Sequence, residues 1–179
     1  MSGTGSSRGN PSMGDIARSI AVLGAIILVL FAVGRLLTVT PDEPTRAVDY
    51  REAVESSRTV ADFDVLAPSS LPDGWRATSV RFEENSWHLG VVTDEDEYVG
   101  LEQVQDGLQR AIGRFAEGSR ADGEAVVGGD TWSVRTGPGD DRTYVRRDSA
   151  GSEGDMTIVV TGTAPREEME RYISSLSAS

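Results

Sequence analysis

The chain has 179 residues, with 17 arginines as its only strongly basic residues against 29 acidic ones, which gives a net charge of −12. It contains no lysine, no cysteine and a single histidine, which excludes P-loop nucleotide sites, Schiff-base chemistry, thiolate metal sites and disulfides. Residues 1–39 carry a net charge of +2 and residues 40–179 a net charge of −14, so we expect the larger part to repel nucleic acid.

The N-terminal region combines a polar tail with a long apolar segment. Residues 1–17 are rich in glycine and serine and are predicted to be a disordered cytoplasmic tail. Residues 18–39 follow, with Arg35 as the only charge inside the apolar run. A helix of this length at about 1.5 Å per residue can cross a bilayer core of about 30 Å. We therefore predict an uncleaved transmembrane helix, because residues 37–41 lack the small-residue cleavage site of a signal peptide.

The arginines close to this segment do not settle its orientation. Arg8 and Arg18 precede its uncharged stretch at residues 19–34, and Arg35, Arg46 and Arg51 follow that stretch, so the positive-inside count is nearly balanced. A short inner tail and a long outer domain is the usual arrangement for an anchor so near the N-terminus. We expect a single-pass protein of the cell membrane, with its N-terminus cytoplasmic, a linker at residues 40–44 and an extracytoplasmic domain at residues 45–179.

The first half of that domain is predicted as a short helix followed by strands. Residues 46–57 place apolar side chains on one helical face. From Thr78 the period changes to two, and the alternation continues through Val91, with Glu84-Asn85 as the turn of a hairpin. An acidic turn then precedes a strand at Tyr98–Val104.

The second half repeats this order of strands and helix. Asp106 is expected to cap a helix that ends before Gly118. Residues 125–127 and 131–135 read as a hairpin around a glycine turn, and strands follow at 142–147 and 156–161, the last one central. A closing helix starts near Pro165. The predicted fold class is α+β, an N-terminal transmembrane helix followed by one antiparallel β-sheet domain with about three helices packed on one face of the sheet.

Four short motifs resemble a known family along nearly the whole chain. They are Leu71-Pro72-x-Gly74-Trp75, Tyr98-x-x-Leu101-x-Gln103, Val127-Gly128-Gly129-x-x-Trp132 and Val160-Thr161-Gly162-x-Ala164-x-x-Glu167-Glu168. The chain is similar in these to actinobacterial single-pass membrane proteins of the domain of unknown function 4245 family. The resemblance implies an N-terminal anchor and one α+β domain outside the membrane, and it implies no activity. The first motif and the closing helix also resemble extracytoplasmic domains of some anti-sigma regulators.

The tryptophans are the most informative candidate core residues. Trp75, Trp87 and Trp132 lie in or beside strands and close to turns, so we predict that they pack in the core, with a ligand-stacking platform beside an apolar groove as the alternative. The residues predicted to be largely buried are Trp75, Trp87, Trp132, Phe82, Leu101, Ile158, Val160 and Ile173.

The polar candidates for a site are weak. His88 alternates with Trp87 and Leu89, which places it on the strand face away from the core; it could sense pH, but a surface or second-layer position without a role is favoured. The acidic runs at residues 94–97 and 140–141 could offer carboxylates to Ca²⁺, yet they lack the spacing of a calcium loop and are predicted to be solvated. No catalytic, cofactor-binding or metal-ligating residue is assigned, and no cofactor is expected.

These observations favour an envelope protein that is not an enzyme. We expect a binding or interaction module for a protein or lipid partner, held in the lipid bilayer through residues 18–39. Its domain, residues 45–179, should be soluble and monomeric without the anchor, and it should not bind nucleic acid. The alternatives are an Asp/Glu-dependent extracytoplasmic hydrolase and an accessory domain of a transmembrane, anti-sigma-like signalling system.

Overall fold

The computed structural model describes residues 22–23, 47–148 and 156–178. The chain divides into two compact units, Met1–Pro44 and Thr45–Ser179. The predicted tail, transmembrane helix and linker therefore lie almost wholly outside the described residues. Within those described residues, no helix combines the length and the apolar character needed to cross a membrane.

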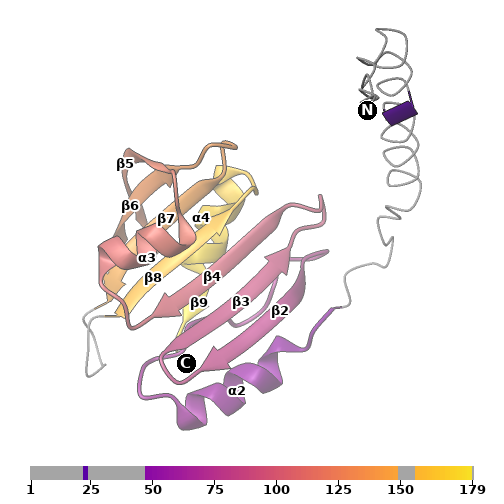
Figure 1. The fold of residues 1–179 in the computed structure, drawn as a ribbon. Helices are drawn as coiled ribbons and strands as arrows, with labels where there is room; N and C mark the ends of the chain where they lie inside the picture. Colours follow the sequence, from indigo (N-terminus) through magenta and orange to yellow (C-terminus); the bar gives the residue numbers. More distant parts are fainter. Residues whose placement is uncertain (1–21, 24–46, 149–155, 179) are drawn as a thin grey trace, which may run out of the picture. The chain divides into compact units, whose positions relative to one another are not determined.

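Seven strands form one antiparallel sheet in the order β2-β3-β4-β8-β7-β6-β5 (Figure 1). Their bounds are β2 Arg76–Glu83, β3 Ser86–Val92, β4 Tyr98–Val104, β5 Arg120–Val127, β6 Asp130–Thr136, β7 Arg142–Asp148 and β8 Met156–Gly162. A second, two-stranded sheet pairs β1, Ala67–Pro68, with β9, Leu176–Ser177. Strand β8 is the central strand of the large sheet, as its unbroken apolar run predicts.

Three helices pack on the large sheet in the described part of the second unit, α2 Tyr50–Val60, α3 Leu108–Phe115 and α4 Arg166–Ser174. This confirms the α+β class. The prediction that all helices share one face is wrong, because α3 and α4 lie on opposite sides of the sheet (Figure 1). The reason is visible in β8, where successive residues Ile158, Val159 and Val160 are all fully buried, so both faces of this strand need a cover.

The main core lies on the face covered by α2 and α4. Trp87, Leu101 and Ile158 from the sheet are fully buried there together with Met169 and Tyr172 from α4. Of the residues predicted to be buried, seven are, and Phe82 is half-buried and packs against the same core. The tryptophans are thus core residues and do not form a groove.

The opposite face holds a much smaller apolar cluster under α3. It joins Ala111 of that helix to Val104, Val145 and Val159 of the sheet. This cluster covers β7, β8 and the end of β4, and it stops short of β2 and β3. Within the described residues, one half of this face is therefore covered by a helix, while the half formed by β2, β3 and most of β4 has no helix over it.

Several predicted boundaries shift by a few residues. Helix α2 begins at Tyr50 and not at residue 46, because the side chain of Asp49 accepts a hydrogen bond from the amide of Arg51 and caps it. Asp106 does not cap α3; Gly107 does, and the Asp106 carboxylate binds Arg110 at 2.8 Å. Strand β5 begins at Arg120, five residues earlier than predicted, since its first half is exposed and lacks an apolar alternation.

Candidate functional site

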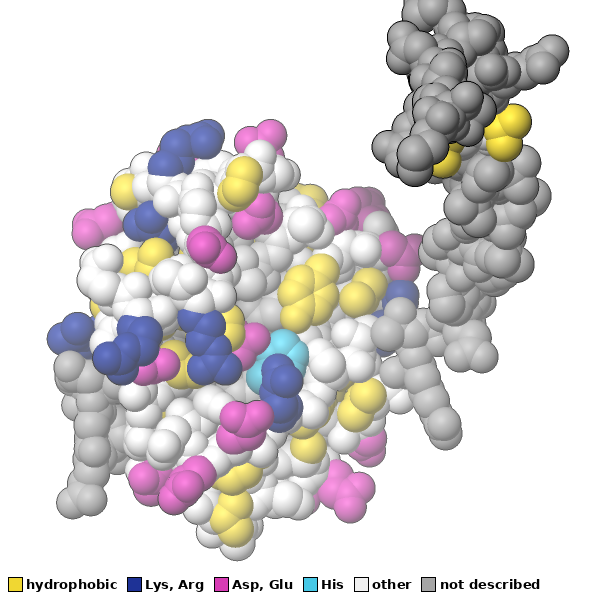
Figure 2. Space-filling view, viewed as in Figure 1, with side chains coloured by type: hydrophobic (Ala, Val, Ile, Leu, Met, Phe, Trp, Pro, Cys, Tyr) yellow, Lys and Arg dark blue, Asp and Glu magenta, His cyan; other side chains and the backbone are white. Residues whose placement is uncertain are grey.

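The half of the sheet face that carries no helix presents a row of polar side chains from three strands. We call this surface, formed by Ser79, Arg81, His88, Tyr98 and Glu102 around Gly90 and Gly100, the open face. Figure 2 shows it from the front, with the only histidine of the chain in cyan near the middle, beside a basic side chain. The alternation of β2 and β3 produces this row, because Val80, Phe82, Trp87 and Leu89 turn to the core.

Three of these residues form a continuous chain of hydrogen bonds. The Nδ1 atom of His88 lies 2.6 Å from a carboxylate oxygen of Glu102, and its Nε2 atom lies 2.8 Å from the hydroxyl oxygen of Ser79. An ionised carboxylate can only accept, so Nδ1 carries a proton. In the neutral ring, Nε2 is then the acceptor for the Ser79 hydroxyl, and the ring is fixed from both sides.

The sheet register explains why these residues meet. His88 lies directly opposite Glu102 on β4, while a β-bulge between Ala77 and Ser79 brings Ser79 opposite Gly90. A Cβ atom at Gly90 would overlap the Ser79 hydroxyl and lie 3.0 Å from the Tyr98 hydroxyl. The absence of a side chain at residue 90 therefore makes room for the Ser79 side chain beside the imidazole.

Two members of the row are shielded from solvent, whereas Arg81 and Tyr98 are exposed. The side chains of His88 and Glu102 are 11% and 14% exposed. Burial raises the pKa of Tyr98, the negative charge of Glu102 raises it further, and Arg81 opposes both effects. The Tyr98 hydroxyl therefore keeps its proton and remains a hydrogen-bond donor at neutral pH.

The other predicted polar candidates stay apart from this row. The acidic run at residues 94–97 forms a turn closed by the amide of Thr93 and the carbonyl of Glu97, and Asp96 binds Arg76 at 2.7 Å. Asp141 closes another turn by accepting the amide of Gly139. Among the described residues, no group of three or more acidic or histidine side chains is arranged to hold a metal ion.

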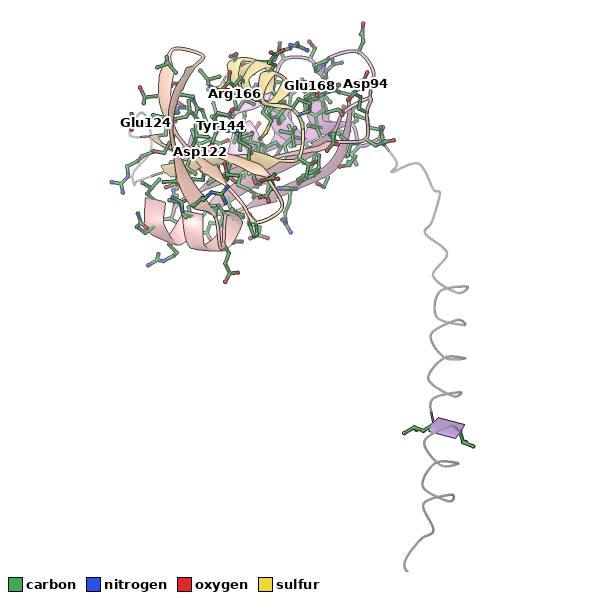
Figure 3. All side chains as sticks on the ribbon, turned by 90° about the horizontal axis from the view of Figure 1, so that it is seen from above. Asp94, Asp122, Glu124, Tyr144, Arg166 and Glu168 are labelled. Atoms are coloured by element: carbon green, nitrogen blue, oxygen red, sulfur yellow. The ribbon has the colours of Figure 1, made fainter. Side chains whose placement is uncertain are left out.

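A second polar cluster joins α4 to the core face of the sheet. The hydroxyl of Tyr144 donates to Glu170 at 3.0 Å, and Arg166 donates to the same carboxylate oxygen at 2.7 Å. Burial, and then the bond to Glu170, raises the pKa of Tyr144 to about 12. Figure 3 shows Tyr144 and Arg166 close to Asp122 of β5. These contacts fix the helix on the sheet and leave the Tyr144 hydroxyl occupied.

Sequence reasoning placed His88 on the correct strand face but missed its neighbours. His88 lies outside the main core, as predicted for a surface or second-layer residue, but its side chain is largely shielded, since the residue is only 9% exposed. Nothing in the local sequence links Ser79 to Glu102, which are 23 residues apart. A hairpin register with His88 opposite Glu102 would have been the only signal, and the bulge in β2 hides the position of Ser79.

Fold and site together define, for the described residues, an α+β domain with an antiparallel sheet, helices on both faces and a polar sheet surface that none of these helices covers. The chain belongs to the family described as "Protein of unknown function (DUF4245)", whose family model matches residues 8–176. The resemblance to this family is thus confirmed, whereas the single-pass membrane character stays a prediction. No curated protein sequence matches the chain.

Two solved structures show a distant likeness to the domain. They are the complex structure of Pseudomonas aeruginosa MucA/MucB and the crystal structure of MucB in complex with MucA(peri), each with 17% sequence identity and a TM-score of 0.36. The likeness covers 63% of this chain, and 34% and 36% of the matched chains, so this chain spans about a third of their length. At this TM-score the likeness carries no conclusion about function.

Proposed function

We propose that this chain is an envelope protein, anchored in the cell membrane through residues 18–39, whose domain binds a protein partner outside the cytoplasm. The apolar segment and its position near the N-terminus support the anchor. The uncovered half of the sheet supports the binding role, and it is the observation that carries the proposal. Binding requires no chemical step, in keeping with the expectation that the domain is not an enzyme.

The acidic residues at 83–84 and 94–97, in and beside the turns that border the open face, favour a partner with a basic surface. Residues 76–104, which contain β2, β3 and β4, include seven acidic residues and two arginines, a net charge of −5. Complementary charge guides association and selects the partner, and it acts over about 10 Å at 0.1 M salt. An accessory domain of a transmembrane signalling system would need the same kind of protein partner.

A lipid ligand is less well supported than a protein. Acyl chains need an apolar cavity or groove, and the tryptophans that could have lined one are packed in the core, with Trp87 and Trp132 at 0% and 2% exposure. The side chains of the open face are polar or charged. We therefore assign the open face to a basic segment of another envelope protein.

The topology can be tested with single cysteines, because the chain has none of its own. Val126 is 75% exposed on β5, so Val126→Cys should react with a membrane-impermeant maleimide on intact cells. Cysteine at Ser6 should react only after lysis. The opposite pattern would place the domain in the cytoplasm and end the envelope proposal.

The partner surface can be tested by site-specific photo-crosslinking in intact cells. A photoreactive residue at Arg81, on the open face, should crosslink to one discrete protein, and the yield should fall steeply when salt is raised to screen the charges. The same residue at Val126 is the matched control on another exposed strand. Equal crosslinking from both positions, or crosslinking from Arg81 to lipid alone, would refute binding of a protein at this face.

A further inference from the structure

Three residues of the open face, Ser79, His88 and Glu102, have the arrangement by which a serine becomes a nucleophile. A hydroxyl is unreactive at neutral pH unless a neighbouring base removes its proton as it attacks. Here Nε2 of His88 lies 2.8 Å from the hydroxyl oxygen of Ser79, and Glu102 holds the other nitrogen at 2.6 Å. Such a group is recognised by its geometry and the roles of its members, whatever the order in the chain or the fold.

We propose that Ser79 is the nucleophile of an ester-cleaving site on the open face, with His88 as its general base and Glu102 as the residue that orients the ring. This goes beyond partner binding, and it departs from the expectation of a non-catalytic domain. The proposal rests on the two hydrogen bonds, on the low solvent exposure of the His88 and Glu102 side chains and on the position of Ser79 at a bulge. Bulges are frequent next to active sites, where they redirect a side chain.

A hydrogen-bond donor that can stabilise the negative charge on the carbonyl oxygen lies beside the nucleophile. Both the Ser79 hydroxyl and the Tyr98 hydroxyl approach one point above Gly90, the position that a Cβ atom would occupy. A carbonyl carbon bound to Ser79 would therefore place its oxygen within reach of the Tyr98 hydroxyl. Tyrosine hydroxyls serve as donors of this kind in oxyanion sites, and burial and then the charge of Glu102 raise the pKa of this one above its ordinary value.

The reaction that follows is balanced without a cofactor. The Ser79 oxygen attacks the ester carbonyl carbon while its proton passes to Nε2 of His88. The bond between that carbon and the alkoxy oxygen breaks, and the leaving alcohol takes the proton from His88. Water then attacks the acyl group on Ser79, gives a proton to His88, and the carboxylic acid leaves as Ser79 recovers its proton.

The surroundings restrict the class of ester. The strands and turns at residues 76–104 carry a net charge of −5, which repels anionic substrates. The open face is a sheet surface bordered by α3 and not a deep pocket, so it suits an ester displayed on a larger molecule. We therefore assign the site to neutral or cationic carboxylic esters carried by a macromolecule.

A fluorophosphonate probe tests the nucleophile directly on the full-length chain in detergent. Attack by Ser79 forms a phosphorus–oxygen bond and expels fluoride, and the adduct is located by mass spectrometry. We expect labelling at Ser79 and a loss of about 10²–10⁴-fold in the labelling rate with His88→Gln. Ser133→Ala is the matched control, since Ser133 is also half-buried on the same face, in β6, and it should label as the wild type does.

Labelling spread evenly over several serines, or an unchanged rate in His88→Gln, would overturn the proposal. Because the adduct is mapped on the wild-type chain, the result does not depend on whether a variant folds. If Ser79 of the wild type is not labelled but the photoreactive residue at position 81 still crosslinks to a protein, the reaction is rejected and the binding function stands. If Ser79 is labelled but no crosslinked partner is found, the binding function is rejected and the reaction stands.

Glu102 and Tyr98 have roles that can be separated. Glu102 is a positioning residue, so Glu102→Gln should lower the labelling rate by about tenfold or more at neutral pH, and Glu102→Asp should restore part of it. Tyr98→Phe should slow the hydrolysis of p-nitrophenyl acetate by about tenfold or more through loss of the donor. An unchanged rate in either variant removes that residue from the site, and equal rates in Glu102→Gln and Glu102→Asp would reject the positioning role.

Discussion

Two halves of one sheet face differ in what covers them. Over β7 and β8, α3 packs Ala111 against Val145 and Val159, and these are nearly or fully buried. No helix in the described part of the chain lies over β2, β3 and most of β4, where the corresponding positions hold His88 and Glu102. Both halves bury their other face in the same main core. The difference between them lies only in the side chains that point away from that core.

This difference shows how the strand pattern decides the layers. In β8, three successive apolar residues give two buried faces, as is typical of a strand with helices on both sides. In β3, Trp87 and Leu89 enclose His88, so only one face is apolar. A helix over β3 would remove the last solvent contact of a histidine and a carboxylate and gain little apolar contact, and such burial costs free energy. The polar row therefore stays open to partners.

The stability of the domain should be most sensitive to substitutions in the main core, into which both halves of the sheet pack. Trp87 is fully buried, and its indole nitrogen donates to the carbonyl of Leu66 at 3.0 Å. Trp87→Ala should lower the free energy of unfolding by about 3–5 kcal/mol, measured by urea unfolding. A loss below about 1 kcal/mol would mean that the strand face assigned to β3 is reversed.

The cover provided by α3 can be tested with a smaller change. Val159 is fully buried under this helix, whereas Val126 is 75% exposed on β5. Val159→Ala should cost about 2–3 kcal/mol through lost burial and a residual cavity. Val126→Ala should stay within about 0.5 kcal/mol of the wild type. If both variants unfold at the same urea concentration, α3 does not stabilise this half of the sheet.

The sequence predicted the strands better than the layers. Strand Tyr98–Val104 and the Glu84-Asn85 turn lie where the alternation placed them. Strands β1 and β9 could not be predicted, because each has two residues and they pair over a long sequence separation, such as that of Ala67 and Ser177, 110 residues apart. The sequence did not predict which face of the sheet α3 covers. Strand β8 is apolar on both faces, so its pattern does not distinguish between them.

The candidate site was beyond sequence reasoning for a different reason. Alternation placed His88 away from the core, and this part of the prediction is confirmed. The contacts with Ser79 and Glu102 arise from strand register and from a bulge, which local patterns do not encode. The acidic runs were candidates because their carboxylates are consecutive in the sequence. Consecutive acidic residues in a turn repel one another and face solvent.

A substitution at Gly90 tests the packing of the open half. A methyl group at Gly90 would overlap the Ser79 hydroxyl, so Gly90→Ala should move Ser79 away from His88 and cost about 1–3 kcal/mol by overpacking. The signals of the imidazole of His88 in an NMR spectrum should shift. A variant with wild-type stability and unchanged imidazole signals would show that Ser79 does not fill the space above this residue.

The smallest effect expected at neutral pH concerns the contact between α4 and the sheet, and it has a distinctive pH dependence. Tyr144→Phe removes the hydrogen bond to Glu170 and should cost about 1 kcal/mol near pH 7. The pKa of Tyr144 is raised to about 12 in the folded chain, against about 10 for an unfolded tyrosine. The folded state therefore holds this proton more tightly, and the stabilisation is complete below about pH 10 and is lost as pH rises toward 12.

The thermal midpoint of the wild type should thus fall between pH 10 and 12 more steeply than that of Tyr144→Phe, and the two curves should converge at the alkaline end. The pKa of Tyr172 is also raised, by complete burial, so both proteins keep a common alkaline decline and only the difference reports on Tyr144. His88→Gln on the open half is the matched control, since it leaves Tyr144 and its hydrogen bond to Glu170 in place. Parallel curves for the wild type and Tyr144→Phe would mean that the hydroxyl is not held by Glu170 in solution.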